Sequence, residues 1–285
     1  MKFASFRRPD GLPTFGLLVT KSGQTGFVDL GRRSAAETLR VFLECGGLRS
    51  ADRFASMDAD FSIDDVSFLP VVPDPDKIIC VGINYASHVR ETGREMPDKP
   101  MIFTRFASSQ TGHEQPLILP KISEKFDFEG ELAVVIGTAG RYIDKNNALN
   151  HVAGYSCYND GSVRDWQRHS TQFTAGKNFP ATGAFGPWLA SSDDVGDIRS
   201  LQLTTRLNGT VMQQATFDDL IFDVPTLIAY CSQFTKLVPG DVIITGTTGG
   251  VGAFREPPVW LKHGDEVTIE IDRIGTLRNV VEIEE

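Results

Sequence analysis

Three acidic residues near the middle of the chain have the type and spacing of a cation site. Glu129 and Glu131 are two residues apart, and an apolar run typical of a buried strand follows at 132–136. Alternation along a strand places both carboxylates on one face. Asp160 ends a second predicted strand that begins at His151. Buried like charges require a cation or a proton, so the alternatives are a metal site and a hydrated surface pair.

The ligand type favours a hard cation at this site. Carboxylates with no Cys or His at a matching spacing suit Mg²⁺, Mn²⁺ or Ca²⁺ better than Zn²⁺. The chain has four cysteines, which are far apart and form no CxxC pair. They indicate reduced thiols in a reducing compartment, and a thiolate metal site is not expected.

A possible catalytic pair lies upstream of the acids. His88 and Glu91 are three residues apart on a predicted short helix, 86–91, directly after a predicted strand, 77–81. A carboxylate beside an imidazole raises its basicity and fixes its tautomer. Gly93 and Pro97 follow closely, as expected of a flap that closes over a site. The alternative is a solvated surface ion pair.

Two basic residues and a glycine-rich loop are candidates for binding an anionic substrate. Arg105 is predicted to hold a substrate carboxylate or to pair with one of the acids, and Lys177 to stabilise an oxyanion. The loop at 246–252 allows backbone N–H groups to approach an anion. A Walker A phosphate loop around Lys177 is excluded because Thr171 and Asn178 stand where Gly and Ser or Thr are needed. No helix follows the glycine-rich loop as dinucleotide binding would require.

The overall composition is that of an ordinary soluble globular protein. The chain has 285 residues, a formal net charge of −9 and no large basic cluster, which argues against nucleic acid and anionic membranes as partners. No apolar leader and no window of about 18 apolar residues occurs, and a cytoplasmic location is expected.

Two parts of the chain differ in pattern. Residues 1–72 predict a small α/β module with strands at 15–20 and 24–30 and a helix capped by Ser34. A proline-rich connection follows at 69–76. Residues 73–285 predict short strands separated by Gly and Pro, a hairpin turning at 208–209 and one long helix at 222–234. The sequence thus predicts a small N-terminal domain, 1–72, and a larger one, 73–285.

Several separated motifs together resemble the fumarylacetoacetate hydrolase superfamily. They are CVGINYASHVRETG (80–93), FDFEGELAVVIG (126–137), AGYSCYNDGSVRDWQ (153–167), GKNF (176–179), FGPWL (185–189), LVPGDVIITGTTGGVG (237–252) and IGTLRN (274–279). The resemblance implies an α+β, predominantly β fold, a mixed β-sandwich roll preceded by a small α/β module, and a homodimer. It also implies roles for single residues: Glu129, Glu131 and Asp160 as Mg²⁺ or Mn²⁺ ligands, His88, Glu91 and Lys177 in catalysis, Arg105, Gln167, Gly246 and Thr247 at the substrate, and Arg164 supporting the metal ligands.

The resemblance also implies a reaction. It is metal-dependent hydrolysis of the C3–C4 bond of a 2,4-dioxo acid to pyruvate and a carboxylic acid, a hydrolase acting on C–C bonds in ketonic substances. The substrate would be an acylpyruvate, fumarylpyruvate or a 2,4-diketo-3-deoxy sugar acid. Decarboxylation of oxaloacetate and isomerisation of 2-hydroxyhepta-2,4-diene-1,7-dioate stay open, because both need the same stabilised enolate. A non-catalytic metal-binding protein is the remaining alternative.

Overall fold

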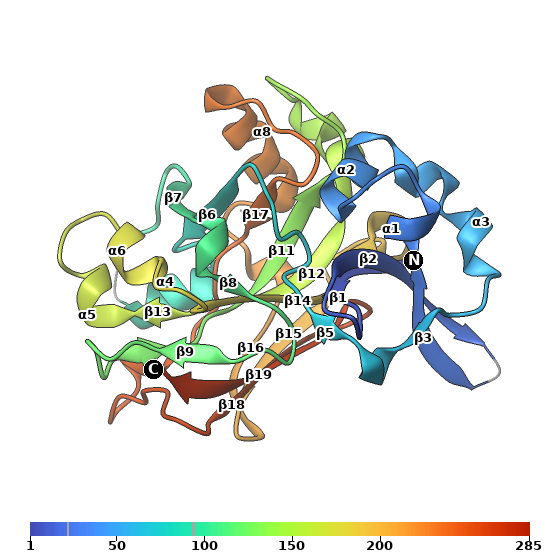
Figure 1. The fold of residues 1–285 in the computed structure, drawn as a ribbon. Coiled ribbons are helices and arrows are strands. Elements are labelled where there is room, and N and C mark those ends of the chain that lie inside the picture. The colour runs from blue at the N-terminus through green and yellow to red at the C-terminus, as the bar shows by residue number, and fades with distance from the viewer. Residues whose placement is uncertain (22, 93–94) are drawn as a thin grey trace.

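A large mixed sheet dominates the computed structural model, which describes residues 1–21, 23–92 and 95–285 (Figure 1). Its strands run in the order β4-β3-β2-β1-β14-β12-β11-β17-β6-β7, and β5 and β8 attach to β1 and β14. A smaller sheet has the order β16-β15-β18-β19-β9, and β10 pairs with β13. The predicted α+β, predominantly β class is confirmed.

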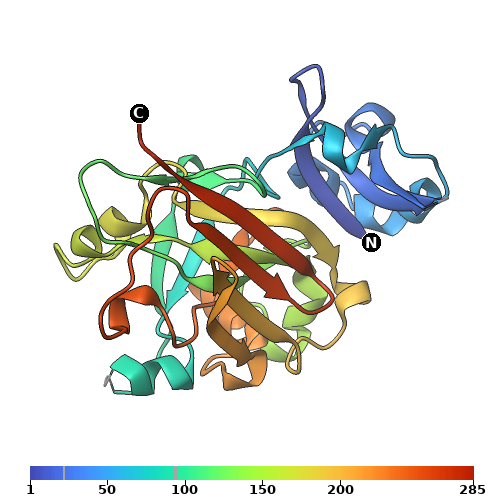
Figure 2. The ribbon, with the colours of Figure 1, turned by 90° about the horizontal axis from the view of Figure 1, so that it is seen from below.

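The N-terminal part supplies one end of the large sheet. Figure 2 shows it, in blue, at one side of the molecule. Its elements are β1 (Lys2–Arg7), β2 (Pro13–Lys21), β3 (Gln24–Asp29), β4 (Phe61–Ser62), β5 (Ser67–Phe68), α1 (Leu30–Arg33), α2 (Leu39–Glu44) and α3 (Asp52–Ala55). The strands expected at 15–20 and 24–30 are present as β2 and β3. The division at residue 72 stays a prediction, and the sheet itself runs across it, because Phe3 of β1 pairs with Leu189 of β14.

The predicted cap of the N-terminal helix is wrong. The hydroxyl of Ser34 donates to the carbonyl oxygen of Leu30 at 2.8 Å, so Ser34 ends α1. Helix α2 begins instead after Thr38, whose Oγ1 accepts from the N–H of Val41 at 3.3 Å. Both residues have a hydroxyl that can satisfy a free helix-end group, so the sequence pattern fits either position.

The larger part contains the central strands. They are β6 (Ile78–Gly82), β7 (Met101–Arg105), β8 (Gln110–Thr111), β11 (Gly130–Ile136), β12 (Val152–Asp160), β14 (Gly183–Ser191) and β17 (Val242–Ile244). The other strands are β9 (Leu117–Leu119), β10 (Phe126–Asp127), β13 (Ser162–Val163), β15 (Gln202–Leu207), β16 (Thr210–Thr216), β18 (Glu266–Ile271) and β19 (Gly275–Ile283). The helices are α4 (Ala86–Thr92), α5 (Arg164–Gln167), α6 (Thr174–Lys177), α7 (Ser192–Val195) and α8 (Val224–Phe234). None of the helices in the described part of the chain has the length and apolar character that crossing a bilayer requires.

Alternation along β11 divides its side chains between two cores. Leu132 and Val134 pack in one apolar cluster with α8 and the small sheet. Ala133 and Val135, on the opposite face, pack in a second cluster with residues of the N-terminal part, Phe3 and Phe42 among them. Glu131 points to the same face of the sheet as Ala133 and Val135. This face is therefore apolar along most of β11 and acidic where the strand starts.

Candidate active site

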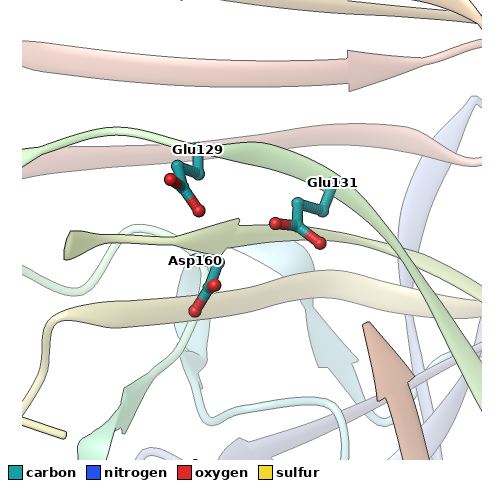
Figure 3. A group of neighbouring side chains, drawn as sticks. All are labelled: Glu129, Glu131 and Asp160. Atoms are coloured by element: carbon teal, nitrogen blue, oxygen red, sulfur yellow. The ribbon is translucent and has the colours of Figure 1, made fainter. Parts of the chain in front are cut away.

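The three predicted acids meet at the start of β11. Strands β11 and β12 are antiparallel, and the N–H of Asp160 donates to the carbonyl oxygen of Glu129 at 2.8 Å. Ligand oxygens of Glu129, Glu131 and Asp160 all lie within 4.8 Å of one another, and Figure 3 shows the three carboxyl groups gathered together. The side chains are 6%, 2% and 0% exposed. This burial excludes the hydrated surface pair.

Three buried cations contact two of these acids. Arg105 Nη1 lies 2.7 Å from Asp160 Oδ1, and Arg164 Nη1 lies 2.6 Å from Glu129 Oε1. Lys177 Nζ bridges Glu129 Oε2, at 2.6 Å, and Asp160 Oδ2. Burial by itself lowers the pKa of Lys177, but the adjacent carboxylates of Asp160 and Glu129 outweigh burial and raise it. The lysine therefore stays an ammonium ion in this cluster.

Glu131 is the acid without a cationic partner among the described residues. Its Oε2 accepts a hydrogen bond of 2.5 Å from the N–H of Gly246. Burial, and then the charges of Asp160 and Glu129, raise the pKa of Glu131 well above its usual range. Arg164 also pairs with Asp127, which is the fourth acid of the cluster. The cluster thus contains four acidic side chains and three basic ones, which are those of Arg105, Arg164 and Lys177. This surplus of acidic oxygen donors fits a hard divalent cation, which would favour the ionised form of Glu131.

A cavity of about 380 Å³ opens above the acids. Glu129, Glu131, Asp160 and Lys177 line it on one side, and Lys177 Nζ lies 5.2 Å from the centre of the Phe103 ring. The other lining groups include apolar side chains and a set of polar ones: Met101, Phe103, Phe173 and Phe254, and Arg164, Gln167, Arg168, Ser170, Thr171 and Thr247. A cavity of this size that combines aromatic side chains with charged and hydrogen-bonding groups fits a small polar molecule.

The residues predicted at the substrate are placed differently from one another. Gln167 and Thr247 line the cavity. Arg105 is buried behind Asp160, donates to Gly161 and Thr182 as well, and is absent from the lining. This is the structural pair that the sequence left open as the alternative for Arg105. Gly246 also does not line the cavity, and its N–H is used by Glu131.

His88 and Glu91 lie on α4, and their side chains are outside the described residues. The main chain before this helix is informative, because Val81, Gly82 and Ile83 line the cavity. Helix α4 therefore begins three residues after the cavity wall.

Two residues at this site, Arg168 and Asp127, were not predicted from the sequence. Arg168 lines the cavity, is exposed and makes no side-chain hydrogen bond or ion pair with a described residue. Asp127 accepts from the N–H groups of Gly252 and Ala253 at 2.8 and 3.0 Å, which ties the glycine-rich loop to the cluster. The FDFEGE stretch contained Asp127 two residues before Glu129, at the same spacing as the two glutamates, and that repeat was the available signal.

Comparison with known proteins agrees with this geometry. Residues 77–282 match the family model for the fumarylacetoacetate (FAA) hydrolase C-terminal domain. The chain belongs to the fumarylacetoacetate hydrolase family. A human relative, "Oxaloacetate tautomerase FAHD2A, mitochondrial", is 39% identical over 287 residues, covering 99% of this chain and 91% of that protein.

Solved structures of the fumarylacetoacetate hydrolase family share the whole fold. The fumarylacetoacetate hydrolase of Exiguobacterium antarcticum superposes with a TM-score of 0.83 at 33% identity, with both chains fully covered. The maleylpyruvate hydrolase of Sphingobium sp. SYK-6, solved in complex with manganese (II) ion and pyruvate, gives 0.82 at 27%, also with full coverage of both chains. The predicted family and its fold are thereby confirmed.

Proposed function

We propose that this protein is an oxaloacetate tautomerase, which interconverts the enol and keto forms of a 2-oxo dicarboxylic acid. The likeness to the human oxaloacetate tautomerase over 99% of the chain carries the choice of reaction. Two features of the cavity support this choice: its lining includes a buried acidic cluster that could hold a cation, and it includes Arg168, which pairs with no acid among the described residues. Both features suit a small dianion.

We propose Glu129, Glu131 and Asp160 as ligands of Mg²⁺ or Mn²⁺. A divalent ion held there would polarise the 2-oxo group and stabilise negative charge on its oxygen. Manganese in the maleylpyruvate hydrolase structure supports this choice of cation for the family. Arg164 is placed to orient Glu129, since its guanidinium bridges that carboxylate and Asp127.

The proton transfer itself needs a donor and an acceptor on the protein. In the direction from enol to keto, the enol hydroxyl loses one proton and C3 gains one, so no proton is consumed overall. His88, oriented by Glu91, is the proposed group that moves a proton at C3. Lys177 supplies a fixed positive charge beside the oxygen on which the enolate charge collects.

The two ends of the substrate are proposed to bind different groups. The 2-oxo acid end faces the acidic cluster, where Gln167 and the Thr247 hydroxyl are available as hydrogen-bond partners. The second carboxylate of oxaloacetate would reach Arg168, whose guanidinium no described acid occupies.

Hydrolysis of the C3–C4 bond of a 2,4-dioxo acid is the second candidate function. The likeness to maleylpyruvate hydrolase favours it, and so does the expectation that His88 activates water. Both reactions pass through an enolate of the same 2-oxo acid end, so the same cluster serves either.

One assay on protein stripped with a chelator and reloaded with Mg²⁺ or Mn²⁺ separates these functions. Accelerated loss of the ultraviolet absorbance of the oxaloacetate enol, without pyruvate, supports the tautomerase. Pyruvate from oxaloacetate means a decarboxylase, and pyruvate plus a carboxylic acid from a short acylpyruvate means a hydrolase. Enol loss at the rate seen in buffer alone would contradict the proposal.

The remaining expectations stay predictions. They are the homodimer, the absence of a nucleic-acid partner and the cytoplasmic location. The human relative carries "mitochondrial" in its name. Size-exclusion chromatography with light scattering would test the dimer.

A further inference from the structure

Gln213 is a buried amide that connects the small sheet to the acidic cluster. It lies on β16 and is 1% exposed. Its Oε1 accepts from the N–H of Gly130 at 2.9 Å. Its Nε2 donates to Thr247 Oγ1 at 2.8 Å and to the carbonyl oxygen of Thr248 at 2.9 Å. One side chain thus joins two segments that both line the cavity region.

Both segments belong to the proposed site. Gly130 stands between Glu129 and Glu131, so its peptide sets the direction of both carboxylates. Thr247 lines the cavity, and its hydroxyl donates to the carbonyl oxygen of Gly130 at 3.0 Å. Gln213, Thr247 and Gly130 therefore form a closed ring of hydrogen bonds.

The ring stands where regular strand pairing stops. Strand β17 pairs with β11 from Val135 to Ala133, and the last backbone hydrogen bond toward the acids runs from the N–H of Thr245 to the carbonyl oxygen of Leu132. Beyond that point the backbone of Gly130 faces the glycine-rich loop. The side chains of Gln213 and Thr247 take the hydrogen-bonding positions that a strand would have filled. Gly130 also has no room for another residue type, because a Cβ there would lie 2.0 Å from Thr205 Oγ1.

We propose that Gln213 is a positioning residue, which fixes the spacing between the two metal-binding glutamates and the substrate-facing Thr247. This inference rests on the proposed metal site. It concerns metal affinity, because a displaced Gly130 peptide would turn Glu129 and Glu131 away from a common cation. Groups that orient metal ligands typically change affinity by about 10- to 100-fold when they are removed.

The test is a calorimetric titration of metal-free protein with Mn²⁺, which needs no substrate. Gln213→Met keeps the length of the side chain and removes all three hydrogen bonds. We expect its Mn²⁺ Kd to rise by about 10- to 100-fold. Gln214→Met is the matched control on the exposed face of the same strand, and its Kd should stay within about twofold of the wild type.

Other outcomes separate positioning from simple packing. A lower Tm of the metal-free Gln213→Met protein with an unchanged Kd would overturn the proposal. If that variant does not fold, Gln213→Asn decides, because the shorter amide cannot reach both Gly130 and Thr247. A Kd in Gln213→Asn equal to the wild type would likewise overturn it.

A double-mutant cycle adds a second readout. Thr247→Val removes the partner of Gln213 in the ring, so the losses of Mn²⁺ affinity in Gln213→Met and Thr247→Val should not add. Strict additivity would contradict the ring. Wild-type protein that binds no divalent ion would remove the metal site and this inference together, whereas absent oxaloacetate activity with intact Mn²⁺ binding would affect the proposed function alone.

Discussion

At the residue scale, Lys177 is the internal counter-ion of the acidic cluster. Its ammonium contacts both Glu129 and Asp160 and is 1% exposed. Removing one partner of a buried ion pair leaves the other charge uncompensated, at a cost of about 3–5 kcal/mol. The stability of the metal-free protein therefore depends on Lys177. The metal-bound protein should depend on it less, because the divalent ion neutralises the same carboxylates.

We predict that Lys177→Met lowers the free energy of unfolding of the metal-free protein by about 3–5 kcal/mol. Adding Mn²⁺ should restore stability by more than it does in the wild type, because the divalent ion replaces the lost positive charge. Thermal unfolding with and without Mn²⁺ measures both effects. An equal Mn²⁺-induced rise of Tm in the two proteins would argue against Lys177 as the counter-ion.

Arg168 is predicted to select dicarboxylic acids. Arg168→Met should raise KM for enol-oxaloacetate by about three- to tenfold and change kcat little, because an exposed charged contact contributes modestly to binding. The enol of a 2-oxo acid that lacks the second carboxylate should show no such change. Steady-state kinetics with the two substrates, and with Arg168→Lys as the charge-retaining control, checks this.

His88→Ala should lower kcat by about two to four orders of magnitude and leave metal affinity intact, because His88 is assigned to proton transfer and not to the metal. Kinetics and Mn²⁺ titration of the same preparation test the two halves. A parallel loss of metal binding would show that the role is misassigned.

The sequence predicted the acids and offered Arg105 and Arg164 as possible partners, but it did not predict which acid each would contact. Two glutamates at a spacing of two, next to an apolar run, are enough to place both carboxylates on one buried face. The pairing of Arg105 with Asp160 joins residues 55 positions apart, which no local pattern encodes. Arg168 carries no pattern at all, since an exposed arginine has the same sequence signature whether or not it faces a cavity.

At the element scale, α5 and α6 touch at Gly176. A Cβ on this residue would lie 2.4 Å from the backbone nitrogen of Gln167 and 2.5 Å from its Cα. The contact positions Gln167 and Lys177, which lie at the ends of the two helices, on the same cavity. Gly176 therefore allows the close approach of two helices that each place a side chain at the cavity.

We predict that Gly176→Ala destabilises the fold by about 1–3 kcal/mol, because the two helices must separate. It should also raise KM, because Gln167 and Lys177 move apart. Urea unfolding and kinetics measure these changes, and Ala175→Ser on the exposed neighbouring position is the control. An unchanged free energy of unfolding together with an unchanged KM would contradict this role of Gly176.

Local signals predicted some elements well. The hairpin turn at Asn208 and Gly209 is present, with φ of 50° and 80°, as a turn of this type requires. The predicted helix at 222–234 is α8, which begins two residues later, after the cap residue Asp223. The predicted cap at Ser34 was wrong because Thr38, four residues later, has a hydroxyl with the same capping chemistry.

At the scale of the whole molecule, His113 of the larger part of the chain contacts Phe68 of the N-terminal part. Its ring stacks edge-on against Phe68 at 4.9 Å, and its Nδ1 accepts from the N–H of Arg278 at 3.1 Å. Glu114 and Arg278 are the charged groups beside it. Burial, and then the charge of Arg278, lower the pKa of His113 to about 4.

Because the pKa of His113 is lowered in the folded protein, the free energy of unfolding depends on pH. The imidazole of His113 binds a proton more tightly in the unfolded chain than in the folded protein. The stabilising contribution of the neutral imidazole is therefore complete above about pH 6.5 and is lost as the pH falls toward 4. Between pH 7 and pH 5 the wild type should lose about 2 kcal/mol more than His113→Asn, which keeps an acceptor for the Arg278 N–H. Urea unfolding at the two pH values tests this, and equal losses would contradict it.

The order of the strands in the large sheet could not be predicted from the sequence. Strand β1 was not predicted, and its partner β14 lies far along the chain. Period-two patterns specify which face of a strand is buried but not which strand lies beside it. The change of sequence pattern near residue 72 therefore gave no sign that one sheet continues across it.

The shared sheet has a consequence for anyone who trims the chain to the match of the family model, which begins at residue 77. Phe185, Leu189 and Ile244 belong to one apolar cluster with Phe3 and Phe42 of the N-terminal part. A shortened protein would present its part of that cluster, together with the vacated edge of β14, to water. We therefore expect a fragment that begins at residue 77 to aggregate more readily than the full chain.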